Sequence, residues 1–211
     1  MKKIVLSLFA ACMLSGVSAQ SLSPIQLKAP EKKAGLSVME TLANRHSTRQ
    51  FSNKELTLQE LSNLLWAANG INRPEKGMRT APSAMNAQEV DVYVCMKEGA
   101  YLYDAKSNQL KPVIQEDLRG LVAGKQDFVK SAPVVLLLVS DLSKLPGGNS
   151  EHSKLMAAVD VGIVSQNISI ACSGLGLITV PRGSMDKDAL AQKLKLKDTQ
   201  MLLMNSPVGK E

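Results

Sequence analysis

The sequence predicts an α+β sandwich, a mainly antiparallel sheet covered by helices, and three observations lead to this fold class. Apolar residues make up 45% of the 211-residue chain, enough to build the core of one domain. Segments with helical periodicity are mixed with alternating, strand-like segments, without the regular strand–helix count of a parallel sheet. One strand-like run is apolar throughout, which is typical of a central strand buried on both faces.

The first twenty residues, MKKIVLSLFAACMLSGVSAQ, have the pattern of a secretory signal peptide. A basic start precedes an apolar stretch that is too short to span a bilayer. The small residues before Gln20 predict cleavage there, so we expect residues 1–19 to be removed and the mature protein to be periplasmic or secreted. Lipid anchoring at Cys12, within FAAC, is the less favoured alternative. No integral membrane span is expected.

Two parts follow the signal peptide. Residues 20–36 are polar and contain two prolines, so they predict an extended N-terminal lead-in. Residues 37–211 carry all the periodic segments and predict a single domain.

The first two helices are predicted from their N-terminal capping boxes. Ser37 with Glu40 starts a short helix that ends near Asn44. Thr57 with Glu60 starts a second helix, whose leucines fall on one face and which stops at Gly70.

The middle of the chain predicts most of the sheet. The loop over residues 71–88 is rich in Pro, Gly, Ser and Asn, and its length favours a functional role. Alternation and turn residues predict strands near 89–96, 100–105 and 109–114. A short helix is expected near 115–125. The run APVVLLLVSD, residues 132–141, is the predicted central strand.

The longest predicted helix covers residues 151–176 and is nearly apolar all round, which indicates burial in a core or a subunit interface. Its polar residues Asp160, Gln166 and Asn167 need partners, either across a dimer interface or on neighbouring loops. A loop, a short helix capped by Asp186 and a last strand over residues 199–210 complete the domain.

Charge and cysteine content exclude some functions. Loss of Lys2 and Lys3 with the signal peptide lowers the formal charge from +6 to +4, and no basic run is interleaved with aromatics, so no nucleic-acid partner is expected. Cys95 and Cys172 lie in apolar surroundings and are expected to be buried free thiols, with a disulfide as the alternative. No Cys or His spacing indicates a metal site.

The segment RHSTRQF, residues 45–51, gathers two arginines and two hydroxyls. In an extended backbone Arg45, Ser47 and Arg49 point to one side, and His46 and Thr48 to the other. Two guanidinium forks and a hydroxyl can hold a phosphate from several directions. The alternative is a solvated basic turn.

Two loops also have ligand-binding potential. In APSAMNAQ, residues 81–88, Pro82 and Ser83 form a turn, and the amides of Asn86 and Gln88 match the edge of a heteroaromatic ring. In GLGLITVPRG, residues 174–183, Arg182 would place a positive charge near any ligand in the loop. Ordinary structural loops are the alternative in both cases.

Together with LTLQELSNLLWAANGI, APVVLLLV, AAVDVGIVSQNISIACSGLGL and the terminal SPVGK, these segments resemble nitroreductase-like FMN-dependent oxidoreductases over about residues 38–210. The resemblance implies an α+β homodimer with one FMN per subunit at the dimer interface. It assigns the FMN phosphate to Arg45, His46, Ser47, Arg49 and Lys210. It assigns the isoalloxazine ring to Pro82, Ser83, Ala84, Asn86, Pro181, Arg182 and Gly183.

The resemblance also implies an activity. FMN would pass hydride or electrons from a reduced donor such as NAD(P)H to a small organic acceptor such as a quinone or a nitroaromatic. The flavin N5 carries this chemistry, so no catalytic side chain is assigned. Arg182 or nearby backbone amides are expected to stabilise the reduced flavin. Met85, where the family often has a small or polar residue, is a departure. The alternative function is an exported flavin-binding protein without turnover.

Overall fold

The computed structural model describes residues 21–211 and confirms the predicted α+β sandwich. This part of the chain contains five α-helices and a seven-stranded sheet in the order β1-β6-β5-β4-β7-β9-β8. All neighbouring strands in it pair antiparallel. The predicted signal peptide and Cys12 lie outside the described residues.

The strands agree with the prediction except at the sheet edges. Their bounds are β1 Ile25–Gln26, β4 Val90–Met96, β5 Gly99–Asp104, β6 Gln109–Ile114, β7 Val134–Asp141, β8 Ile178–Thr179 and β9 Gln200–Gly209. The sequence did not predict β1, in the lead-in, or β8, in the loop before the last helix. Each has only two residues, too few for an alternating pattern to show.

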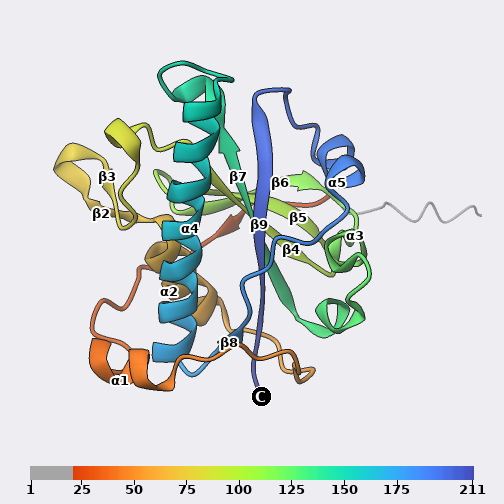
Figure 1. The fold of residues 1–211 in the computed structure, drawn as a ribbon. Coiled ribbons are helices and arrows are strands. Elements are labelled where there is room, and N and C mark those ends of the chain that lie inside the picture. Colours follow the sequence, from red (N-terminus) through yellow and green to blue (C-terminus); the bar gives the residue numbers. More distant parts are fainter. Residues whose placement is uncertain (1–20) are drawn as a thin grey trace, which may run out of the picture.

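Helices cover both faces of the sheet (Figure 1). On one face lie α1 (Val38–Asn44), α2 (Leu58–Asn69) and α4 (Glu151–Gly174). On the other lie α3 (Arg119–Ala123) and α5 (Lys187–Leu194). The two predicted capping boxes are confirmed. The Ser37 and Thr57 side chains accept from the backbone N–H of Glu40 and Glu60, and the carboxylates of these two glutamates accept from the backbone N–H of Ser37 and Thr57.

Strand β7 lies between two hydrophobic cores, as its continuous apolar run predicts. Val134, Leu136 and Leu138 belong to the core under α2 and α4. The alternate residues Val135, Leu137 and Val139 belong to the core under α3 and α5. Both sets are buried because successive side chains of a strand point to opposite faces.

Helix α4 is long and apolar enough to cross a membrane by length and composition alone. In the structure it lies across the sheet and contacts α1, α2, β7 and β9 (Figure 1). Its apolar composition is therefore explained by its place in the core. At its C-terminal end Gly174 lets α1 approach closely, since a Cβ there would lie 3.0 Å from Thr41 Oγ1.

The segment predicted as an irregular loop, residues 71–88, contains a hairpin. Strands β2 (Ile71–Arg73) and β3 (Met78–Arg79) pair antiparallel, and Gly77 between them has a left-handed φ of 61°. Figure 1 shows this hairpin standing out from the body of the molecule beside α4. The short 3₁₀ helices are η1 (Pro74–Lys76), η2 (Ala84–Asn86), η3 (Asp127–Ser131) and η4 (Leu142–Lys144).

Candidate functional site

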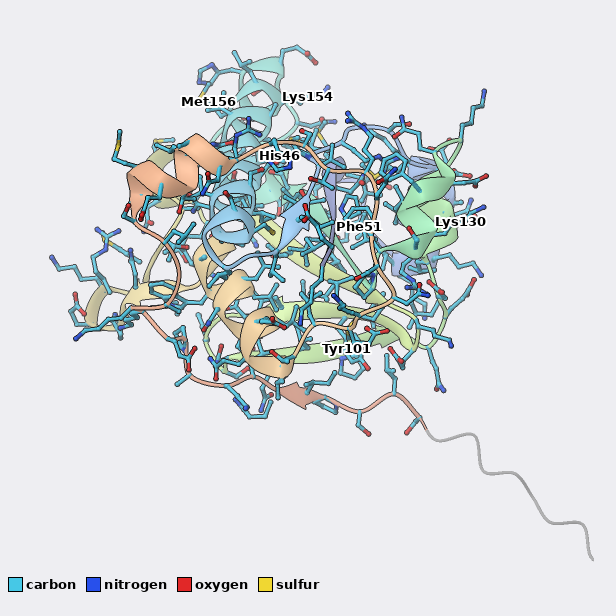
Figure 2. All side chains as sticks on the ribbon, turned by 90° about the horizontal axis from the view of Figure 1, so that it is seen from below. His46, Phe51, Tyr101, Lys130, Lys154 and Met156 are labelled. Carbon is cyan, nitrogen blue, oxygen red and sulfur yellow. The ribbon has the colours of Figure 1, made fainter. Side chains whose placement is uncertain are left out.

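The 45–51 segment runs extended across one end of the molecule, from α1 past His46 to Phe51 (Figure 2). Hydrogen bonds fix the segment at its middle residue and at the residue that follows it. The Thr48 N–H donates to the Thr179 carbonyl of β8 at 3.0 Å. The Ser52 N–H donates to the Lys210 carbonyl at 2.9 Å, and its hydroxyl donates to the same oxygen at 3.0 Å. The segment is therefore held against the ends of β8 and β9.

Gly209 in β9 makes this close approach possible. A Cβ at this position would lie 2.9 Å from Phe51 Cδ1 and 3.0 Å from Pro133 Cδ, so any side chain would displace the segment. The Phe51 ring also stacks on Phe128, with 6.4 Å between the ring centroids.

The side chains of the segment separate as the extended backbone predicts. His46 and Thr48 line a cavity of about 210 Å³ together with polar residues of α4 and β8, namely Ser169, Ser173 and Thr179. The alternate residues Arg45, Ser47 and Arg49 do not line it. His46 Nδ1 lies 2.8 Å from the Asn44 carbonyl oxygen.

The two arginines of the segment have no acidic partner among residues 21–211. None of the ion pairs in this part of the chain includes Arg45 or Arg49. Arg49 and Ser47 are exposed, and Arg45 is half-buried. Two uncompensated guanidiniums beside a free hydroxyl suit an anion such as a phosphate.

The Arg182 guanidinium is engaged inside the protein. It is 7% exposed, and its guanidinium donates to four oxygens: Gln126 Oε1 at 2.8 Å, Asn205 Oδ1 at 2.6 Å, the Val122 carbonyl at 3.3 Å and the Ala123 carbonyl at 3.2 Å. Its backbone pairs with Asn205 in both directions. The Arg182 charge therefore ties the loop before α5 to β9 and the α3 region. Pro181 and Gly183, on either side of it, remain predicted ring contacts.

The Lys210 ammonium is also engaged within the protein. It lies 2.9 Å from Glu60 Oε2, the carboxylate that caps α2. Partial burial of Glu60 tends to raise its pKa, but the hydrogen bonds from Lys210 and Thr57 lower it below its ordinary value. The predicted contact between Lys210 and a phosphate would compete with this ion pair.

The 82–88 loop has a backbone that few residues adopt. Met85, Asn86 and Gln88 have left-handed φ values of 50°, 56° and 52°. Such values are uncommon outside glycine, above all for a residue like Met85. Strained backbone of this kind persists only when the surroundings fix it, and it often marks a functional site.

Hydrogen bonds from both sides fix this loop. Ser83 Oγ accepts from the Gln88 N–H at 2.9 Å, and the Gln88 amide donates to the Gly77 carbonyl at 3.0 Å. Arg79 Nε donates to Gln88 Oε1 at 3.0 Å. The Gln88 amide, expected to face a ligand, is therefore used inside the loop, whereas Asn86 and Pro82 are exposed.

Asp160 of α4 supports the loop through a hydrogen bond, in which its Oδ2 accepts from the Ala84 N–H at 2.7 Å. The sequence left open whether the polar residues of α4 find partners across a dimer interface or within the chain. Asp160 is partnered by a neighbouring loop, and Asn167 likewise donates to the Ala68 carbonyl within the chain.

Glu89 is a site residue that sequence reasoning missed. Its side chain is fully buried, and both carboxyl oxygens lack a hydrogen-bond partner among the described residues. Burial and the neighbouring Asp160 carboxyl raise its pKa to about 7, against the opposing effect of Lys144. The only sequence signal for a buried Glu89 was its position directly before an apolar strand. An acid at the solvated end of a strand gives the same pattern.

The two candidate regions contact α4 at different positions, the 82–88 loop near the middle of the helix and the 45–51 segment near its C-terminal end. Asp160 contacts the 82–88 loop, whereas Ser173 Oγ donates to the Thr41 carbonyl of α1, next to the 45–51 segment. Thirteen residues of helix separate these contacts, about 20 Å at the rise of an α-helix. Within one chain the two regions therefore face different parts of the surface.

The two cysteines are free and buried. Burial raises the pKa of Cys95 to about 12 and raises that of Cys172 as well, so neither is a reactive thiolate. Among residues 21–211, no group of three His, Cys, Asp or Glu side chains is placed to hold a metal ion.

Comparison with known proteins gives one consistent result. The family described as "Nitroreductase family" matches residues 42–210. "Putative nitroreductase MJ1384" of Methanocaldococcus jannaschii is 31% identical over 82% of this chain and 90% of its own length. A crystal structure from Ralstonia eutropha JMP134, described in similar words, is 34% identical, covers 90% of both chains and superposes with a TM-score of 0.84. "FMN reductase [NAD(P)H]" of Bacillus subtilis is 26% identical over 70% of this chain and 54% of its own length.

The structural role of Arg182 predicts a loss of stability on mutation. Arg182→Ala leaves the oxygens of Asn205, Val122 and Ala123 without their donor, so we expect the free energy of unfolding to fall by about 2–4 kcal/mol. Arg49→Ala, which removes an exposed guanidinium, should change it by less than about 0.5 kcal/mol. Urea unfolding followed by circular dichroism measures both, and equal effects would contradict the assignment.

The raised pKa of Glu89 predicts a pH-dependent stability. The folded protein keeps the Glu89 proton up to about pH 7, whereas an unfolded chain loses it near the ordinary glutamate pKa of 4.5. Folding therefore takes up a proton between these values, and this contribution to stability is lost as pH rises, up to about 3 kcal/mol. Glu89→Gln should be more stable than the wild type at pH 8 but not at pH 5. The matched surface variant Glu98→Gln, at an exposed glutamate that is in none of the ion pairs among the described residues, should show no such gain in urea unfolding.

Proposed function

The chain belongs to the nitroreductase family, and from this premise we propose that it is an FMN-dependent oxidoreductase. Its reaction passes hydride or electrons from a reduced donor such as NAD(P)H to a small organic acceptor such as a quinone or a nitroaromatic. The name of the Bacillus subtilis relative, an FMN reductase, supports both the flavin and the donor class. The single observation that carries the proposal is the unpaired arginine pair beside α1.

Arg45, Ser47 and Arg49 fit the phosphate of FMN. They share one side of an extended segment, and no carboxylate among the described residues neutralises the two guanidiniums. The segment is anchored through Thr48 and Ser52, so the arginines are placed before any ligand arrives. Preorganised, charge-assisted hydrogen bonds of this kind hold a phosphate at low entropic cost.

The 82–86 loop fits the flavin ring. Bound FMN supplies hydride and electron transfer at its N5 position. The chain contributes a rigid surface: Pro82 and Asn86 are exposed, while Ser83 and Ala84 are held from inside by hydrogen bonds. Backbone amides fixed in this way can orient a ring and exclude water from one of its faces.

The separation of the two regions along α4 favours a homodimer. Exposed apolar residues occur in the N-terminal half of this helix, at Leu155 and Val159. Others lie on α1, which packs near the C-terminal end of α4: Val38, Met39 and Leu42. A two-fold crossing of two copies would place one apolar end against the other. The same crossing would bring the 82–86 loop of one chain toward the 45–49 segment of its partner. Each flavin site would then use both chains.

The predicted export of the protein affects which electron donor is available to it. The signal peptide over residues 1–19 would place it in the periplasm or outside the cell, where NAD(P)H is not expected to be plentiful. This feature favours a different reductant, or the second candidate function, an exported flavin-binding protein without turnover. Both candidates need the same FMN site.

Removal of both arginines tests the phosphate site. The double variant Arg45→Ala, Arg49→Ala should purify folded but with at least tenfold less FMN, because the phosphate loses both cations. A matched double variant, Lys76→Ala with Lys106→Ala, removes two exposed charges elsewhere and should keep its flavin. The measurement is the visible spectrum with mass identification of the released chromophore. Full FMN content in the arginine variant would refute the site.

Reduction of the bound flavin separates the two candidate functions. An oxidoreductase should lose its absorbance near 450 nm when NADH, NADPH or another reductant is added without oxygen, and regain it with a quinone or nitroaromatic. A protein that stays yellow with every donor, or stays reduced with every acceptor, is a carrier. A colourless protein with no affinity for FMN excludes both.

A further inference from the structure

Two buried acids lie together beneath the strained 82–88 loop. Asp160 is 4% exposed on α4, and Glu89 is fully buried at the residue that follows the loop. Asp160 is the neighbouring carboxyl that raises the pKa of Glu89, and none of the ion pairs among residues 21–211 includes either acid. Asp160 holds the loop directly, through the 2.7 Å hydrogen bond from the Ala84 N–H.

Burial and the Asp160 carboxyl both favour the neutral form of Glu89. Lys144 of η4 is the cation that acts on Glu89, but its ammonium is bonded to Asp91 at 3.4 Å. Asp141 lies next in the chain to η4 and binds Ser143 and Thr199 instead. His152 and Ala84 line a cavity of about 220 Å³ together. A buried carboxyl beside a second carboxyl and without a paired cation ionises only at a cost, so Glu89 keeps its proton.

We propose that Asp160 and Glu89 are positioning residues, and that a neutral Glu89 lets Asp160 hold the 82–88 loop in its left-handed conformation. A neutral Glu89 does not repel the Asp160 carboxyl, which therefore stays hydrogen-bonded to the Ala84 N–H at 2.7 Å. When Glu89 ionises, repulsion pushes Asp160 away and the loop loses its support from α4.

The effect that we expect on flavin binding rests on the proposed function, because the loop is the predicted contact of the flavin ring. The loop backbone is strained at Met85, Asn86 and Gln88, and it relaxes when a support is removed. Loss of the Asp160 contact should therefore both mobilise the loop and weaken FMN binding. The first effect needs no flavin, so it can be measured whether or not the proposed function is correct.

The experiment measures amide hydrogen exchange of a peptide covering residues 82–90 in the flavin-free full-length protein at pH 6 and pH 8.5. After correction for the intrinsic pH dependence, the wild-type loop should exchange at least tenfold faster at pH 8.5. Glu89→Gln, which keeps the neutral form, should remain protected at both values. Asp160→Ala should exchange fast at both, and Asp160→Asn, which keeps an acceptor oxygen, should restore much of the protection without the pH step. Asp117→Asn should behave as the wild type.

FMN titration of the same proteins gives the second readout. We expect the wild-type dissociation constant to rise about tenfold between pH 6 and pH 8.5, and that of Glu89→Gln to stay constant. Equal protection of the wild type and Glu89→Gln across this range would overturn the proposal, and so would a protected loop in Asp160→Ala. A loop that opens without any change in FMN affinity would also overturn the positioning role. If no variant binds FMN at any pH, the proposed function fails, and hydrogen exchange alone decides whether the pair holds the loop.

Discussion

The packing of α4 against the sheet is the constraint on which the other features depend. This helix packs against β7 and β9, and its middle and its C-terminal end support the two candidate binding regions. At Gly174 the absence of a side chain lets α1 come close, and α1 leads directly into the arginine segment. At Asp160 a carboxylate holds a loop amide. One rigid element therefore sets the positions of groups that are far apart in the sequence.

Most of the fold could be read from local patterns. The capping boxes at Ser37 and Thr57, the two-sided apolar run of β7 and the Asp186 cap of α5 all depend on neighbours within a few residues, and all are confirmed. The two-residue strands β1 and β8 and the β2–β3 hairpin were missed. β1 and β8 pair with strands elsewhere in the chain, which periodicity does not record, and β2 and β3 are too short for an alternating pattern to show.

The candidate site was less predictable because charge alone does not say where a side chain points. Arg45 and Arg182 look alike in the sequence, yet one lacks an acidic partner and the other donates to four internal oxygens. Gln88 looked like a ligand contact but is used to brace its own loop. Glu89 showed no distinguishing pattern, because its burial follows from the approach of α4 and its neighbours. Long-range packing decides each of these cases.

The burial of both thiols has a practical consequence. Cys95 and Cys172 each have a raised pKa and lie in a different part of the core, Cys95 in the core under α3 and α5 and Cys172 in the core under α4. An alkylating reagent can reach either one only in molecules that have opened at that place. The alkylation rates of the two sulfur atoms therefore report separately how often each of the two hydrophobic cores opens.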